Sequence, residues 1–272
     1  QRKRPITKLD RVPITAVNRP DIAFDHWSCD IIGPLVPENN TSVPRFALVM
    51  IDQASKWPEV IALRNPTTKN VCDGMLSVWA TTGTPRTITL DNASYFTSEL
   101  HKEFLRRLGC SPRFITPLHP EANSVAERGL ATIKIAIAKT EQPKKWQSAI
   151  GPVLWAIREQ PHSTTHVSPY FYVFGKIPRG PLSILKDFWT CGQTHTVKMG
   201  RSTDQYLAEL KEHLETAKQF AEYYTEKEQA SYVKYYNKHA KEKSFTENEH
   251  VLVLLPDTTS SKVFSRWREG VI

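Results

Sequence analysis

The sequence is poor in cysteine and has no long apolar run, and each shortage excludes a class of protein. Its four cysteines are scattered, with no Cys-x-x-Cys pair, so neither a disulfide framework nor a cysteine-rich zinc site is expected, and a reducing compartment is favoured. No run of 18 or more apolar residues occurs, so we expect no membrane-spanning helix and no membrane partner. The first five residues, QRKRP, are unlike a signal peptide. No initiator methionine precedes Gln1, and we therefore expect a piece of a longer protein.

Positive charge is in excess. Lysine and arginine number 36 against 28 acidic residues, which gives a net charge of +8 and a pI near 9.3. This balance favours a polyanionic partner such as nucleic acid, although solubility alone would also explain it. With 272 residues, of which 40% are hydrophobic, the chain is long enough for one core domain with additional segments.

Apolar runs bounded by turn signals predict an α/β domain before residue 140. The predicted strands are residues 23–33, 45–52, 57–63, 86–90 and 112–116, with a hairpin turn at residues 53–56. Two predicted helices, residues 67–82 and 98–108, each end at a glycine, and a third contains Glu127. The residues expected to face the core are Val71, Met75, Leu76, Val78 and Trp79 in the first helix and Leu100, Phe104, Leu105 and Leu108 in the second. The order β-β-β-α-β-α-β-α indicates a mixed sheet.

After residue 140 the pattern becomes helical. Residues 146–158 predict one helix, and a passage rich in proline, serine and threonine follows at residues 161–180. Apolar residues from Tyr206 onward recur at intervals of three and four, which predicts a long helix packed on another part of the protein. They are Leu207, Leu210, Leu214, Ala217, Ala221 and Tyr224. Its continuation at residues 227–243 is polar with interleaved tyrosines, and residues 249–255 and 262–267 predict strands of a small, incomplete β module.

Three carboxylates are candidates for a metal site. Asp30 lies within the first apolar strand, where a charge is costly unless it is paired or binds a metal. Asp91 ends a parallel-type strand, where ligands of α/β sheets gather, and Glu127 opens a helix. Each has an ordinary alternative: a solvent-facing sheet position for Asp30, an Asp-Asn turn for Asp91, and a capping box with Ser124 for Glu127. Spacing alone decides nothing, because 28 acids in 272 residues give about three pairs at any chosen separation by chance.

Phosphodiester chemistry gives three carboxylates a reason to act together. Cleavage and transfer need an activated oxygen nucleophile, an in-line leaving oxygen and neutralised phosphate charge, and two Mg²⁺ ions about 4 Å apart supply all three. The all-oxygen ligand set favours magnesium over zinc. Lys134 shares a helical stripe with Glu127, which suits either a phosphate contact or a solvated face. The natural core face of that helix is a neighbouring stripe of Ala126, Leu130, Ile133 and Ile137.

Six segments, taken in order, resemble the integrase catalytic core of retroviruses and, more closely, of Ty3/gypsy-type LTR retrotransposons. They are residues 27–35 (WSCDIIGPL), 51–59 (IDQASKWPE), 90–96 (LDNASYF), 119–128 (HPEANSVAER), 162–169 (HSTTHVSP) and 172–176 (YVFGK). The resemblance covers nearly the whole chain, from about residue 11 to residue 272.

The resemblance implies an RNase H-like fold, a five-stranded mixed sheet flanked by helices. It implies that Asp30, Asp91 and Glu127 form a D,D-35-E triad that holds two Mg²⁺ or Mn²⁺ ions, with Asp30 bridging both. Four further residues would contact DNA or line the active-site loop: Lys134, Arg128, Asn123 and His119. The implied activity is that of an integrase, a polynucleotidyl transferase that trims the 3′ ends of element DNA and joins them to target DNA within a homo-oligomer.

The resemblance also implies a domain order. Residues 1–20 would be a linker after a missing zinc-binding domain, residues 21–175 the catalytic core and residues 176–201 a connector. Residues 202–245 would be a helical segment and residues 246–272 a truncated SH3- or chromodomain-like β module. A nuclear location, for which Arg2-Lys3-Arg4 is slight support, or a place in virus-like particles is expected.

Two departures from the family pattern concern glycine. Ala93 replaces the glycine that usually follows Asp-Asn, and residues 120–124 read PEANS where glycines are usual, so a stiffer active-site loop is expected. Two other functions remain open on sequence alone. One is a host-captured integrase-derived protein that binds DNA or partners without catalysis, and the other is an RNase H-like nuclease that hydrolyses without joining.

Overall fold

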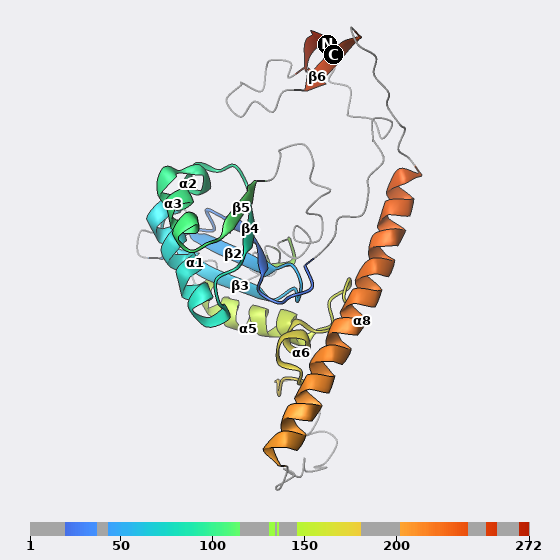
Figure 1. Ribbon diagram of the computed structural model, residues 1–272. Helices are drawn as coiled ribbons and strands as arrows, with labels where there is room; N and C mark the ends of the chain where they lie inside the picture. Colours follow the sequence, from blue (N-terminus) through green and yellow to red (C-terminus); the bar gives the residue numbers. More distant parts are fainter. Residues whose placement is uncertain are drawn as a thin grey trace.

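The computed structural model describes residues 20–36, 43–114, 131–133, 135, 146–180, 202–238, 249–254 and 267–271. Its centre is a five-stranded sheet in the order β3-β2-β1-β4-β5 (Figure 1). The strands are β1 (His26–Ile32), β2 (Phe46–Asp52), β3 (Pro58–Leu63), β4 (Thr87–Leu90) and β5 (Ser111–Phe114). β1, β2 and β3 pair antiparallel, whereas β4 and β5 continue the sheet parallel to β1. The predicted α/β mixed sheet is therefore confirmed.

The hairpin between β2 and β3 closes on a buried aspartate. Asp52 Oδ2 accepts hydrogen bonds from the Ser55 backbone N–H at 2.8 Å and from the Ser55 hydroxyl at 2.6 Å. Lys56 has φ 65°, and its ammonium donates to the Gln53 carbonyl oxygen. Burial raises the pKa of Asp52, and the hydrogen bonds from Ser55 oppose that rise. This acid therefore has a structural role in the turn predicted at residues 53–56.

One face of the sheet is covered by α1 (Thr68–Thr82), α2 (Ser94–Thr97) and α3 (Glu99–Arg107). The hydroxyl of Thr67 caps α1 by accepting from the Asn70 N–H at 3.3 Å, and Gly83 ends it at φ 84°. The first core cluster lies between these helices and alternate residues of the strands. Its fully buried members include Trp27, Leu48, Met50, Met75, Ile88, Leu90, Phe96 and Leu105.

Two leucines predicted to face this core lie outside it. Leu76 of α1 is 48% exposed and Leu100 of α3 is 60% exposed, so both assignments are wrong. On α3 the buried residues are His101 and Leu105, with Phe104 and Leu108 partly buried against the cluster. These four follow the i, i+3, i+4, i+7 pattern of one helix face. Helical period, rather than hydrophobicity, therefore decides which side of α3 is buried.

The opposite face carries a second cluster. Ala47, Val49 and Ile51 of β2 pack there against Ile133, which belongs to a short helical stretch at residues 131–133, and against Trp146. Trp146 begins α5 (Trp146–Glu159), and its indole N–H donates to the Pro44 carbonyl oxygen at 3.0 Å. Ile133 is 1% exposed, which agrees with its predicted place on the core face of the helix that contains Glu127. This is the face that matters for the candidate site.

A long helix, α8 (Thr203–Asn237), runs alongside the domain and packs on α6 (Pro169–Phe174) (Figure 1). Ala217 and Ala221 are buried against Val167, whereas Leu207 is 54% exposed, so the predicted seam is wrong at its first position. Two polar contacts and one ring contact hold the helix. Nδ1 of His213 lies 2.9 Å from the Gly175 carbonyl oxygen, Lys218 Nζ lies 2.8 Å from Asp21 Oδ2, and the centroid of the His166 ring lies 4.3 Å from that of Tyr224, with the two rings tilted by 36°.

The C-terminal residues contribute β6 (His250–Leu254) and β7 (Trp267–Val271), which form an antiparallel pair. The second strand is later than the predicted strand at residues 262–267. Only this pair of the predicted β module lies among the described residues, so an SH3-like fold stays a prediction, as do the domain boundaries. No helix within the described ranges is both long and apolar enough to cross a membrane.

Candidate active site

Asp30 and Asp91 lie on neighbouring parallel strands. The last pairs of the β1–β4 register are Trp27 with Ile88 and Ser28 with Thr89. Two residues further along each chain are Asp30, still within β1, and Asp91, the first residue after β4. The same register therefore continues to place the two aspartates opposite each other, at the carboxyl end of β4.

Strand alternation puts both aspartates on the face that carries the second cluster. Trp27, Cys29, Ile88 and Leu90 point into the first core cluster, so the residues between and beyond them point the other way. Ile32, which shares the side of Asp30, packs with the cluster that contains Ile133. The described part of the predicted Glu127 helix thus covers the face to which both aspartates belong.

Burial and the negative charges of both Asp30 and Asp91 raise the pKa of the same two side chains, Tyr95 and Cys29. Burial, followed by Asp91 and then Asp30, raises the pKa of Tyr95 to about 12. Burial and the same two aspartates also raise the pKa of the Cys29 thiol. Two side chains from different elements therefore sense both negative charges. The Tyr95 phenol remains protonated near neutral pH and can donate a hydrogen bond.

Each aspartate also has a local hydrogen bond. Asp30 Oδ1 accepts from the Ile31 backbone N–H at 2.8 Å, and Asp91 Oδ1 accepts from the Ala93 N–H at 3.2 Å. The turn role considered for Asp91 is therefore present. Asp30 is partly exposed and Asp91 is exposed. Ala93 has φ −67° and ψ 149°, a conformation open to any residue. Its backbone does not require the glycine usual at this position.

Sequence reasoning missed a row of polar side chains leading up to the aspartates. His26 Nε2 lies 2.9 Å from the Thr89 hydroxyl, and the Gln53 amide donates to the Ser28 hydroxyl at 2.7 Å. Arg113 of β5 pairs in register with Thr89. Burial, helped by the charge of Arg113, lowers the pKa of His26 to about 4. A signal was available, because every second residue of His26-x-Ser28-x-Asp30 and Thr87-x-Thr89-x-Asp91 is polar.

The donor chemistry of this face fits a hard divalent cation. Two carboxylates at one level of adjacent strands, both open to solvent, offer the oxygen ligands that Mg²⁺ and Mn²⁺ prefer. Within the described ranges no group of three or more histidines, cysteines or acids is placed to hold a metal. Glu127 lies outside those ranges, as do Lys134, Arg128, Asn123 and His119. The triad and its DNA contacts therefore stay predictions.

Comparison with known proteins agrees with this architecture. Residues 20–120 match the integrase core domain family. The chain is 29% identical over 194 residues to the Gag-Pol polyprotein of Walleye dermal sarcoma virus, an alignment that covers 70% of this chain and 11% of that protein. It is 25% identical over 160 residues to the human gypsy retrotransposon integrase-like protein 1, covering 57% and 30% respectively.

A solved structure shows the same fold. It is the simian T-cell lymphotropic virus intasome in complex with PP2A regulatory subunit B56 gamma. The match has a TM-score of 0.50 at 17% identity and covers 60% of this chain and 58% of that one. The chain thus spans only a small part of the polyprotein it matches. In sequence it resembles the integrases of retroviruses and gypsy-type retrotransposons, and its five-stranded sheet with flanking helices is the RNase H-like fold of their catalytic cores.

Proposed function

We propose that this chain is an integrase, a polynucleotidyl transferase that trims the 3′ ends of retroelement DNA and joins them to target DNA. The observation that carries the proposal is the parallel register of β1 and β4 in an integrase-like sheet, which, continued by two residues, brings Asp30 and Asp91 to one level on one face. DNA, a homo-oligomeric assembly and a location in the nucleus or in virus-like particles are parts of the same proposal.

Asp30, Asp91 and Glu127 are the residues that would hold two Mg²⁺ or Mn²⁺ ions. When bound, the ions would activate the attacking oxygen and neutralise charge on the phosphate. The partial exposure of Asp30 and the exposure of Asp91 leave this face open to a DNA strand. Lys134, Arg128, Asn123 and His119 would contact that DNA from the predicted helix and its preceding loop.

Arg113 is a further candidate for positioning the DNA backbone. It is exposed on the edge strand β5, in register with Thr89, two residues before Asp91. Arg113 forms no ion pair with any residue that the structure describes. A guanidinium can bind a phosphate through two parallel hydrogen bonds. We infer that it binds a phosphate next to the scissile one.

The test is the substitution Asp91→Asn, compared with Asp73→Asn on the exposed side of α1 as a matched control. With Mg²⁺, Asp91→Asn is expected to lower both the nicking of an uncut duplex end and strand transfer from a pre-cut end by about 100-fold or more. DNA affinity in EDTA should stay within about twofold of the parent. Activity in the variant equal to that of the parent would refute the assignment.

The same assay separates the alternatives. Nicking without joining identifies a nuclease that hydrolyses only, and DNA binding without either product identifies a non-catalytic, integrase-derived protein. The ordinary backbone of Ala93 removes one argument for the second alternative, because the missing glycine costs this turn nothing.

A further inference from the structure

In the C-terminal half of α8, Lys227, Lys234 and Lys238 have no acid three or four residues away within the helix, although Glu222, Glu226 and Glu228 lie in the same half. Earlier along the helix, Lys211 lies 3.9 Å from Glu215 and Lys218 lies 3.7 Å from Glu222, both as i, i+4 pairs. Between Glu228 and Lys238 no acid occurs, whereas Lys234 and Lys238 repeat at i, i+4. Like charges at that spacing destabilise a helix. Lys234 and Lys238 therefore repel each other, whereas the two earlier lysine–glutamate pairs attract.

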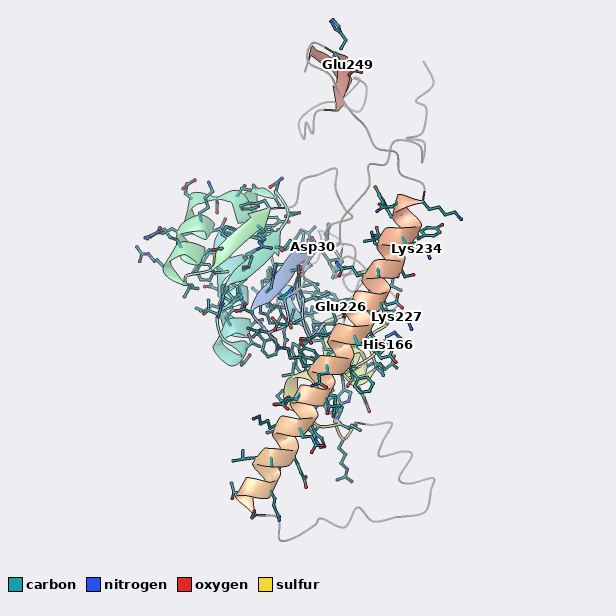
Figure 2. The ribbon with its side chains drawn as sticks, turned by 45° about the vertical axis from the view of Figure 1, so that its right-hand side comes forward. Asp30, His166, Glu226, Lys227, Lys234 and Glu249 are labelled. Carbon is teal, nitrogen blue, oxygen red and sulfur yellow. The ribbon has the colours of Figure 1, made fainter. Side chains whose placement is uncertain are left out.

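Lys227 shows the same pattern. The residues three and four positions away from it are Tyr223, Tyr224, Ala230 and Ser231, so no acid on the helix can reach it. Neither Lys227 nor Lys234 forms an ion pair with any residue in the described ranges. Figure 2 shows both along this half of α8. Cations in the last turn favour the helix dipole, which explains Lys234 and Lys238 but leaves Lys227 unexplained.

The lysines share one face with exposed aromatic side chains. Phe220, Tyr223, Lys227, Lys234 and Lys238 follow one another at spacings of 3, 4, 7 and 4, which keeps them on a single stripe. We call these five residues the basic stripe. Phe220 is 54% exposed and Tyr223 is 61% exposed. Large aromatic residues left in water beside lysines are typical of surfaces that bind nucleic acid.

Two acids beside the stripe, Glu222 and Glu226, lie on a different side of the helix. Glu222 and Glu226 line a cavity of about 100 Å³ together with Asp21, Lys56 and Tyr172 of the core domain. Lys227 follows Glu226 directly and so lies about 100° further around the helix. The side of α8 that carries Glu222 and Glu226 therefore faces the core domain, and the basic stripe is turned away from that cavity.

We propose that the basic stripe of α8 is a docking surface for DNA, separate from the face that carries Asp30 and Asp91. From Phe220 to Lys238 the stripe extends over about 27 Å of helix, which matches the rise of about eight base pairs. The three ammonium groups bind phosphates without regard to sequence, and Phe220 and Tyr223 stack on unpaired bases or pack against sugars. The inference rests on the proposed function for its partner, since an integrase acts on DNA.

The decisive comparison is between two triple variants with the same loss of charge. One carries Lys227→Gln, Lys234→Gln and Lys238→Gln. The control carries Lys69→Gln, Lys102→Gln and Lys211→Gln, which are exposed lysines on other helices or in the first half of α8. Fluorescence anisotropy in EDTA measures binding to a labelled duplex and to a single strand of about 30 nucleotides over a series of salt concentrations.

The stripe variant should bind duplex about tenfold or more weakly near 0.1 M salt, and the slope of log K against log salt should fall by about 2.7, or 0.9 per lost phosphate contact. The control should keep most of the parent slope. Phe220→Ala with Tyr223→Ala should weaken single-strand binding about tenfold and leave the slope unchanged. Equal slopes in the two triple variants would overturn the inference.

Competition with poly-glutamate at equal charge distinguishes an acidic protein partner. If poly-glutamate displaces DNA as well as unlabelled DNA does, and the aromatic variant binds DNA normally, the stripe is not a DNA surface. If the parent chain neither nicks nor joins DNA but the stripe variant still loses the salt slope, the proposed function fails and the stripe stands. If the parent chain is fully active and the two triple variants have equal slopes, the proposed function stands and the stripe fails.

Discussion

Gly175 tests how firmly α8 is docked on the domain. It follows α6 with φ 62°, in the left-handed region. A Cβ atom at this position would lie 2.9 Å from Leu210 Cδ1 and 3.1 Å from Leu214 Cγ of α8. Gly175→Ala therefore combines two costs. The left-handed backbone costs about 1 kcal/mol for alanine, and overpacking against two leucines costs about 1–3 kcal/mol more.

Gly109→Ala supplies the matched control. Gly109 has φ 67°, but a Cβ there meets nothing within 4 Å, so only the backbone cost of about 1 kcal/mol applies. Urea unfolding should show Gly175→Ala to be about 2–4 kcal/mol less stable than the parent, and Gly109→Ala about 1. Adding Leu214→Ala should lessen the additional penalty of Gly175→Ala, because it removes one of the colliding side chains. Equal losses for the two alanine variants would refute the docked arrangement.

Two more predictions concern the core. Burial lowers the pKa of His26 from 6.5 to about 4. Between those pH values the unfolded chain therefore binds a proton that the folded chain does not. His26 should thus make the free energy of unfolding rise by up to about 3 kcal/mol from about pH 4 to pH 6.5. In urea unfolding, His26→Gln should flatten the pH dependence of the free energy of unfolding more than His166→Gln does, because His166 is exposed. Equal effects of the two substitutions would contradict the argument. Leu105→Ala should lower the free energy of unfolding by about 2–5 kcal/mol, whereas Leu100→Ala should lower it by less than about 0.5 kcal/mol. Similar losses would show that Leu100 belongs to the core.

Hydrophobic pattern predicted the five strands and the main helices because each apolar run is bounded by a turn or capping residue. The prediction failed where an apolar residue does not lie on the helix face that a period of about 3.6 residues buries. In α3 the period selects His101, whose ring is buried although neither ring nitrogen has a hydrogen-bond partner among the described residues. Hydrophobicity selected Leu100, which is exposed. The same conflict misplaced Leu76, five residues after Val71 and therefore on another side of α1.

The short helix α6 was overlooked although its signals were present. Ser168 caps it by accepting from the Phe171 N–H at 3.2 Å, Pro169 occupies its first turn, and Gly175 ends it. A segment rich in proline, serine and threonine suggests a loop by composition. The positions of those residues, rather than their number, identify a helix.

The pairing of β1 with β4 could be anticipated only in part. The alternating polar residues of each strand point to a shared polar face, but the sequence does not state which strands are neighbours or in which register. In this fold a crossover through β2, β3 and α1 brings the strands together, 61 residues apart. The proximity of Asp30 and Asp91 therefore follows from the strand order of the sheet, and no short sequence motif predicts it.

Asp91 shows that a turn role and a metal role need not compete. Its hydrogen bond from the Ala93 N–H uses Oδ1, while an ionised carboxylate offers about four acceptor sites in all. Asparagine forms the same kind of turn, because its side-chain oxygen can accept that bond, yet it lacks the negative charge that a divalent cation requires. Asp91→Asn should therefore keep the end of β4 in place and remove only the charge. A loss of catalysis in a variant with unchanged unfolding free energy would then be assigned to metal binding, whereas a matching loss of stability would point to the turn.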